Sequence, residues 1–300
     1  MNALPRLHVW LVRYEVLQDG TLPPLPTTAL HGALARAVYS DVCIAPARPT
    51  CEACPAESHC AYPILFEPTP AACRRLREFG VTTEPPRPLA IAPDAPFLPT
   101  GESPIPVRRG QIVSFRLTAT SKVWQYWEAL RRGLERIGRQ GLGPREERTR
   151  LRLVSVEAHS TPLPNENTNE VALRFVTPLR LKHSGQIASE VDGKVLAEAL
   201  ARRAVFIGHL EGLVWQAPPE LGGWLESVES ISAFRLVRVG RYSSRQGRWM
   251  RWPGLVGTLR LRGEGVRHLL PLLHFGSLAQ VGKATTFGFG RYELTAPTTS

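Results

Sequence analysis

An arginine-rich stretch with interleaved aromatic residues is the part of the sequence best suited to bind a polyanion. No acidic residue occurs between Glu229 and Glu264, and the segment GRYSSRQGRWMRW within it alternates arginines with Tyr242, Trp249 and Trp252. Guanidinium groups contact phosphates and aromatic rings stack on bases, so the pattern predicts binding to single strands or hairpin ends of RNA. The alternative is a solvated edge hairpin that its charge protects from aggregation. The arginines of this stretch are Arg235, Arg238, Arg241, Arg245, Arg248, Arg251, Arg260 and Arg262.

Four cysteines form a second group with chemical potential. Cys43, Cys51, Cys54 and Cys60 offer enough thiols for a tetrahedral zinc site or an iron–sulfur cluster. Only one CxxC pair is present and the spacing is not that of a zinc ribbon, although His59 could replace one thiol. The alternative is a knuckle of free cysteines. With the fifth, Cys73, the number is odd, which fits poorly with a secreted disulfide framework.

A glycine-rich segment near the end of the chain, GSLAQVGKATTFGFGRYEL, surrounds Lys283. It is not a P-loop, because five residues separate Gly276 from Gly282 where four are required, and Ala284 replaces the magnesium-binding Ser or Thr. We expect its glycines to let backbone amides approach another backbone closely, with Lys283 as a point charge.

Composition sets the broad class of the protein. The chain has 300 residues and a net charge of +11, with 37 Lys and Arg against 26 Asp and Glu. Most of the cations are arginine, which grips phosphate bidentately, although a GC-rich genome would produce the same bias. At 43% hydrophobic and 21% charged residues the chain is globular and long enough for two domains. The sequence predicts neither a membrane helix nor a signal peptide, so we expect a soluble, cytoplasmic protein without membrane contact.

A second basic stretch, 131–152, is weaker evidence for a polyanion. It contains Glu135, Glu146 and Glu147, and Glu135 has oppositely charged neighbours at helical spacing. A charged outer helix face explains it as well as an RNA contact does.

The elements that must position these residues fall into two similar halves. In the first half, the residue pattern predicts a strand at 7–17 and a helix at 27–42 with Thr27 or Thr28 as N-cap. An elaborated region at 43–106 follows, and then a strand at 111–120, a helix at 124–137 and a strand at 150–158. After a linker at 160–169, the second half predicts a strand at 170–182, a helix at 192–212, two strands within 233–263, a helix at 266–278 and a strand at 287–294.

Each half therefore reads as a split β-α-β unit. The predicted fold is α+β, with tandem ferredoxin-like (RRM-like) domains at 1–160 and 168–300 and a Cys/Pro-rich insertion at about 43–106 in the first. On the helix at 27–42, Gly32, Arg36 and Tyr39 fall opposite the apolar stripe, and His31 lies at the edge of that stripe.

Two motifs resemble a known family. The segment GKATTFGFGRYEL resembles the signature loop of the RAMP superfamily of CRISPR proteins, and LPTTALHGALARAVYSDVC followed by CEACPAESHCAYPILFEP resembles the start of its repeat-RNA-processing endoribonucleases. The resemblance implies metal-independent cleavage of precursor CRISPR RNA at the base of a repeat stem-loop. The 2′-OH attacks the phosphorus, leaving a 2′,3′-cyclic phosphate. It also implies that the mature crRNA stays bound, and that other CRISPR effector subunits are partners.

The same resemblance implies a catalytic residue on the first helix. The usual motif reads roughly Leu-Arg-Gly-Ala-x-Gly-His-Ala, whereas residues 30–37 read LHGALARA, with His and Arg exchanged. His31 acting from one turn away and Arg36 in an arginine-based site, as in divergent type IV processing nucleases, are both candidates. The predicted catalytic residues are His31, Arg36, Tyr39 and Arg241. The predicted RNA contacts are Arg238, Tyr242, Arg245, Arg248, Trp249, Arg251, Gly282, Lys283, Gly288, Gly290 and Arg291.

Two other functions are compatible with the sequence. A non-catalytic RNA-binding subunit of a CRISPR effector complex would use the same charge and the same glycine loop. A binder of double-stranded DNA would explain the charge but not the glycine loop.

Overall fold

The computed structural model describes residues 3–47, 50–52, 54–67, 87–94, 101–143, 148–163, 165, 167–183, 186–243 and 248–295. Arg245, Cys73 and much of the predicted insertion lie outside these ranges, as do the side chains of Tyr242, Ser243 and His183. No helix in the described ranges has the length and apolar character needed to cross a membrane.

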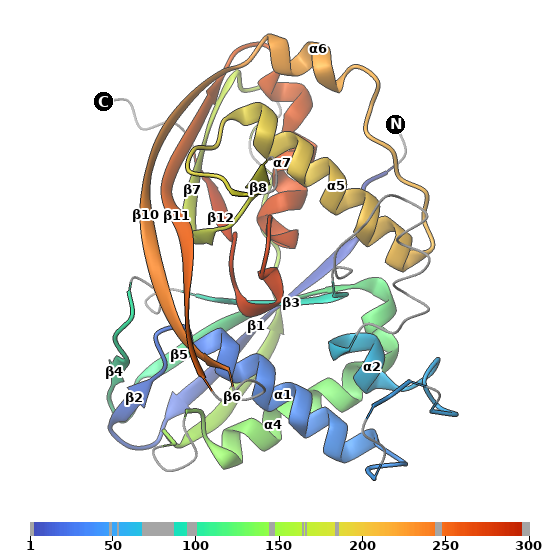
Figure 1. The fold of residues 1–300 in the computed structure, drawn as a ribbon, viewed down its shortest axis with the longest axis vertical. Helices are drawn as coiled ribbons and strands as arrows, with labels where there is room; N and C mark the ends of the chain where they lie inside the picture. Colours follow the sequence, from blue (N-terminus) through green and yellow to red (C-terminus); the bar gives the residue numbers. More distant parts are fainter. Residues whose placement is uncertain are drawn as a thin grey trace.

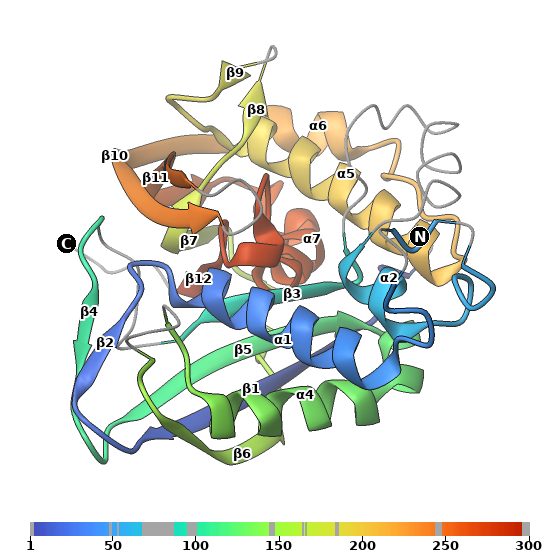
Figure 2. The same ribbon diagram turned by 60° about the horizontal axis from the view of Figure 1, so that its bottom comes forward.

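The N-terminal half is built on a four-stranded antiparallel sheet with the order β3-β5-β1-β6. Tyr14 of the central strand β1 is fully buried and donates a hydrogen bond from its hydroxyl to the carbonyl oxygen of Leu134, 2.9 Å away in α4. Figure 2 shows α1 and α4 side by side on one face of this sheet. The bounds are β1 (Leu7–Val16), α1 (Pro26–Val42), β3 (Leu89–Pro93), β5 (Ile112–Thr120), η1 (Ser121–Tyr126), α4 (Trp127–Gln140) and β6 (Leu151–Ala158), with β2 (Gly20–Leu22) paired to β4 (Ile105–Val107) and α2 (Ala61–Phe66) against α1.

The C-terminal half repeats this arrangement with the strand order β10-β11-β7-β12. In both halves the first strand of the unit lies between the third and the fourth, which is the ferredoxin-like order, so the predicted tandem fold is confirmed. The bounds are β7 (Glu170–Leu179), β8 (Lys182–His183), β9 (Gln186–Ile187), α5 (Gly193–Glu211), α6 (Leu221–Glu226), β10 (Glu229–Ser243), β11 (Arg248–Arg262), α7 (Val266–Ala279), η2 (Thr285–Phe287) and β12 (Tyr292–Thr295).

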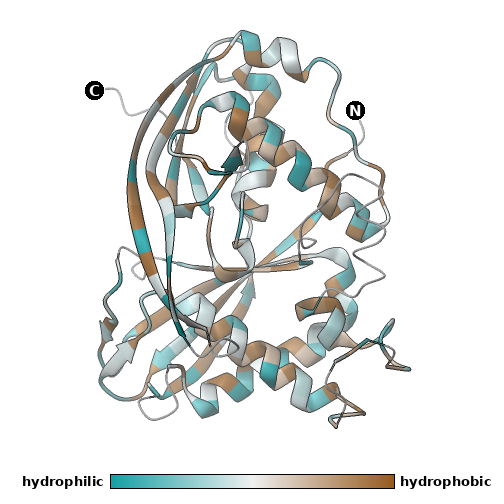
Figure 3. Cartoon of the chain, in the orientation of Figure 1, coloured by the Kyte–Doolittle hydropathy of each residue, from teal (hydrophilic) through white to brown (hydrophobic). Residues whose placement is uncertain are grey.

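The hairpin β10–β11 reaches past its own sheet toward α1 (Figure 1). Hydrophobic and hydrophilic residues alternate along β10 (Figure 3), as expected for a strand with one covered face. Near the end of β10, Val239 packs with Leu25 and Phe289 in a small core shared by the two halves. The hairpin therefore joins the halves as well as completing the second sheet.

Three local predictions were wrong. The N-cap position of the first helix is Leu25, and no side chain caps it, because Thr27 is buried and bonded elsewhere. The helix predicted at 124–137 is α4, which begins only at Trp127, after a 3-10 turn at 121–126. The last strand begins only at Tyr292, because Gly288 and Gly290 adopt positive φ angles of +94° and +73° that do not fit an extended strand.

Candidate functional site

His31 lies where the two halves of the molecule meet. Its ring is T-shaped against Phe66 of α2, with centroids 5.5 Å apart, and against Phe287 of η2, with centroids 4.9 Å apart. Its Nε2 atom is buried and has no hydrogen-bond partner among the described residues. His31 is therefore not the hydrogen-bonded surface histidine that a place at the edge of the helix would suggest.

The surroundings of His31 keep its imidazole neutral at pH 7. Burial is the main cause that lowers its pKa to about 3, and the positive charges of Arg87 and Arg241 lower it further. A neutral imidazole can accept a proton, and a nearby anion would raise its pKa again. The site is thus arranged to receive a negative charge.

Arg241 is a cation of the second half that borders this arrangement. Its guanidinium carbon lies 4.4 Å from the ring centre of Phe287 and 4.6 Å from that of Trp252. Arg180, at the end of β7, stacks on Trp252 as well, at 5.0 Å. The Nε atoms of Arg180 and Arg241 are buried and have no partner among the described residues, so both cations retain unused hydrogen-bonding capacity.

The glycine-rich loop holds Phe287 between His31 and Arg241. Thr27 of α1 donates a hydrogen bond of 2.6 Å from Oγ1 to the carbonyl oxygen of Phe287, which ties the loop to the first half. On the other side, the amide of Lys283 donates to the carbonyl oxygen of Arg180 at 2.7 Å. A Cβ atom on Gly282 or Gly290 would collide with a neighbouring carbonyl oxygen, as the predicted close approach of backbones requires.

A family model named AF_1859_N and described as an N-terminal domain matches residues 4–174, more than half of the chain. The model of the CRISPR-associated endoribonuclease Cas6 matches residues 173–292, which include the arginine-rich hairpin and the glycine loop. The C-terminal part of the chain thus matches Cas6, and the chain as a whole is a Cas6-like CRISPR protein.

Solved structures share the fold of this Cas6-like protein. Cas6 of Thermus thermophilus is 16% identical with a TM-score of 0.53, covering 98% of this chain and 100% of that chain. A structure described as a Cas6 product complex is 19% identical with a TM-score of 0.57, covering 97% and 100%. A Cas6-related protein of Pyrococcus furiosus is 11% identical with a TM-score of 0.55, covering 98% and 100%. No curated protein matches the chain in sequence.

Arg36 and Tyr39 lie apart from His31 in the Cas6-like protein. Arg36 is exposed and forms no ion pair with another described residue, in contrast to the enclosed His31. The Tyr39 ring packs on Tyr62, with centroids 4.9 Å apart. A hydrogen bond with Cys43 is the main cause that raises the pKa of the Tyr39 hydroxyl. Of the predicted catalytic residues, only His31 and Arg241 are brought to the same aromatic ring.

The predicted RNA contacts separate into accessible and buried groups. Arg238, Arg248 and Trp249 are exposed on the hairpin, and Trp249 retains 65% of its surface. Arg251 is exposed but pairs with Glu102 at 3.1 Å. Arg291, by contrast, is 2% exposed and is bonded to carboxylates, so it is a buried ion-pair partner rather than an accessible RNA contact. Those carboxylates are Asp94 at 3.1 Å and Glu293 at 2.8 Å.

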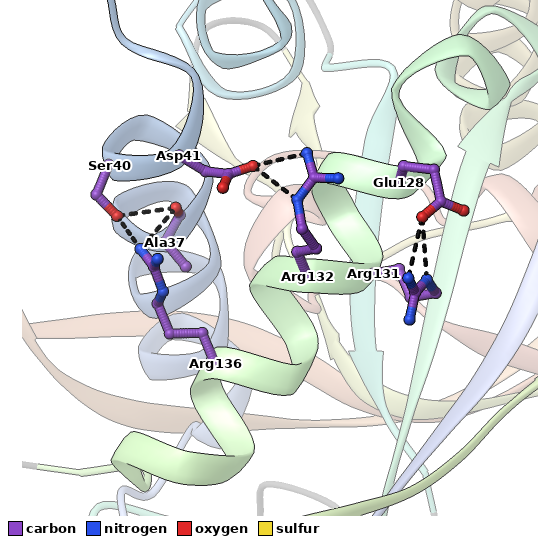
Figure 4. A network of polar contacts seen from close by, with 7 residues as sticks. All are labelled: Ala37, Ser40, Asp41, Glu128, Arg131, Arg132 and Arg136. Carbon is purple, nitrogen blue, oxygen red and sulfur yellow. Dashed lines mark hydrogen bonds and ion pairs between the residues drawn. The ribbon is translucent and has the colours of Figure 1, made fainter.

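The second basic stretch is largely neutralised on its helical part. Figure 4 shows Arg132 of α4 bonded to Asp41 and Arg136 bonded to Ser40, both on α1. Arg131 pairs with Glu128 at 3.1 Å and also with Glu135. These contacts favour the interpretation of a charged outer face that joins two helices.

All four candidate thiols line one small pocket beside α1 and α2, together with Tyr39 and Tyr62. Burial is the main cause that raises the pKa of the Cys51 thiol to about 12, and the nearby Glu67 raises it further. Among the described residues, no three His, Cys, Asp or Glu side chains already stand at the spacing of a metal site.

Sequence reasoning missed Arg180, Phe287 and Phe66 as parts of the site. Phe287 belongs to the glycine-rich segment, where it follows two threonines and directly precedes Gly288. This place within the motif was the signal that could have identified it. Arg180 carries no such signal, because it simply follows a buried strand.

Proposed function

We propose that this Cas6-like protein cuts precursor CRISPR RNA within the repeat, without a metal ion, through attack of a ribose 2′-OH on the adjacent phosphorus. The observation that supports this most is the unpartnered, neutral His31 at the same ring as Arg241. The Cas6 family model and similar solved structures described as Cas6 product complexes also favour RNA processing.

In the proposed reaction, His31 accepts the proton of the attacking 2′-OH at Nε2. The new P–O2′ bond forms as the P–O5′ bond breaks, which leaves a 2′,3′-cyclic phosphate. The 5′-oxygen takes a proton, either from the imidazolium or from water. Arg241 and Arg180 balance the charge that develops on the phosphorane, which is the role that fixed cations fill best.

The low pKa of free His31 is compatible with this role because RNA brings the missing charge. The shift to about 3 comes from burial and from two cations. A phosphate between Arg241 and His31 would offset the cations and raise the pKa of the ring toward neutrality. The base would then gain strength only when its substrate is bound.

Arg36 is the alternative catalytic residue in our proposal, because it occupies the frame position at which the family motif has its histidine. Its exposure is suited to contact with a phosphate that approaches from solvent. Tyr39 would orient RNA only at a distance from His31, since eight helical residues span about 12 Å.

RNA binding is proposed along the β10–β11 hairpin and beside Lys283. Arg238, Arg248 and Trp249 are the exposed groups that support it, and Tyr242 and Arg245 are further candidates from the sequence. We also propose that the cut RNA stays bound, that other CRISPR effector subunits associate with the complex, and that the protein acts in the cytoplasm.

The test is single-turnover cleavage of the cognate repeat RNA in EDTA by His31→Ala, Arg241→Ala and Arg36→Ala. Loss of a general base costs roughly 10²–10⁴-fold in rate, and loss of a charge-stabilising donor costs roughly 10²–10³-fold. Arg131→Ala is the matched control, since that arginine is exposed and pairs with surface carboxylates. Full activity in all three site variants would refute the assignment.

A non-catalytic RNA-binding subunit is the second candidate. The exchange of His and Arg in the first helix favours it, because the frame position of the usual histidine holds Arg36. The same EDTA reaction separates the two functions: a nuclease yields one cut with a cyclic-phosphate end, and a binding subunit yields a gel shift without product.

A further inference from the structure

The four thiols converge from three separate segments of the chain. Cys43 directly follows α1, and its amide bonds to the carbonyl oxygen of Tyr39. Cys60 directly precedes α2. Cys51 and Cys54 form a turn between them, closed by a hydrogen bond of 3.1 Å from the amide of Cys54 to the carbonyl oxygen of Cys51. All four cysteines are free and line the same pocket.

The size of that pocket limits what it can hold. Its volume is about 20 Å³, close to the space that one water molecule needs. A single ion fits this space. The other residues that line the pocket are Tyr39, Ile44, Ala56, Glu57, Tyr62 and Pro63.

Four cysteine thiolates form the donor set that zinc binds in structural sites, with tetrahedral geometry and Zn–S bonds of about 2.3 Å. His59 is not needed as a fifth donor. It does not line the pocket, and its Nδ1 atom forms a hydrogen bond of 2.7 Å with Ser58.

We propose that Cys43, Cys51, Cys54 and Cys60 bind one structural zinc ion that fastens the end of α1 to the start of α2. The described thiols surround the pocket but do not yet stand at metal-binding spacing, so binding must draw the connecting segment inward. Coupling of this kind is usual, because zinc sites are seldom preformed without the ion.

The site would support the candidate active site indirectly. Phe66 at the end of α2 packs on His31, and Tyr62 of the same helix packs on Tyr39. Zinc at the start of α2 would therefore fix the helix that closes one side of His31. The cysteines themselves would touch no RNA.

The test is the metal content of the full-length protein, purified with a reducing agent and dialysed after incubation with zinc. We expect about one zinc per chain in the wild type. The double variant Cys51→Ser, Cys54→Ser should lose it. The matched control is Cys73→Ser, which removes the cysteine outside the set and should retain full occupancy.

A second measurement does not depend on the folding of the variants. Removal of zinc from the wild type by a chelator should speed cleavage after Glu52 and Glu57 by a glutamate-specific protease, because the segment loses its anchor. Mass spectrometry locates the cuts. The proposal is overturned by wild-type protein that retains no zinc, by equal loss in Cys73→Ser, by bound iron with inorganic sulfide, or by chelation that leaves this cleavage unchanged. None of these readouts requires RNA cleavage, so the two proposals fail independently.

Discussion

Acidification from pH 7 to pH 5 should reveal the burial of His31 as a loss of stability. In the unfolded chain the imidazole has its ordinary pKa of 6.5, whereas in the folded protein the pKa is about 3. At a pH between these two pKa values, the imidazole binds a proton in the unfolded state but not in the folded state. Stability is therefore lost as the pH falls below about 6.5, and the loss continues down to about pH 3.

The magnitude follows from the difference between the two pKa values. A pH of 5 is 1.5 units below the pKa of 6.5 that the ring has in the unfolded chain. Each unit corresponds to about 1.36 kcal/mol. Protonation thus favours the unfolded state by about 2 kcal/mol at pH 5, compared with about 0.2 kcal/mol at pH 7. The folded state gains almost nothing in return at either pH.

The assay compares wild type with His31→Gln, which cannot titrate, by urea unfolding at both pH values. The wild type should lose about 2 kcal/mol more than the variant on acidification. His159 and His274 also have pKa values lowered by burial, but their contributions are common to both proteins and cancel. NMR titration of the histidine rings gives the pKa directly. Equal losses in the two proteins, or titration of His31 near 6.5, would refute the reasoning.

Three further predictions concern the loop, the hairpin and the buried ion pair. Gly290→Ala should lower the free energy of unfolding by more than about 2 kcal/mol, because a Cβ would collide with Val281, whereas Gly222→Ala, which faces open space, should have almost no effect on the thermal midpoint. Trp249→Ala should weaken repeat-RNA binding by about 1–3 kcal/mol at fixed salt, and an unchanged gel shift would exclude stacking on this ring. Arg291→Met should cost about 2 kcal/mol of stability, because Asp94 and Glu293 lose their buried partner and keep only Arg116 and Arg174; a cost as small as that of the exposed Arg131→Met, under about 1 kcal/mol, would contradict this role.

Periodic patterns were sufficient to predict most of the long elements of the fold, but not β3 or α2, which lie within the predicted insertion at about 43–106. The strand predicted at 7–17 is β1 (Leu7–Val16), and the helix predicted at 266–278 is α7 (Val266–Ala279). Both have an apolar face that repeats at the period of their element, and burial of that face is what fixes them. The topology followed because two halves with the same order of elements have one common solution, the ferredoxin-like sheet.

The contacts between the halves could not be predicted in this way. Thr27 has the residue type and position of an N-cap, yet its hydroxyl bonds to Phe287, which lies 260 residues away. Arg291 has the residue type expected of an RNA contact, yet it is buried against carboxylates. In each case a partner distant in the sequence decides the role, and a local pattern carries no record of that partner.

The exchange of His and Arg in the first helix acquires a physical meaning from these contacts. Five helical residues rotate a side chain by about 140°, so positions 31 and 36 face different surroundings. Position 31 meets Phe287 and the charge of Arg241, whereas position 36 is exposed. A proton acceptor benefits from a dry site in which an arriving phosphate controls its pKa, whereas an arginine keeps its charge in solvent. If the glycine loop sets the surroundings of His31, its displacement by Gly290→Ala should raise the pKa of His31 as well as destabilise the fold.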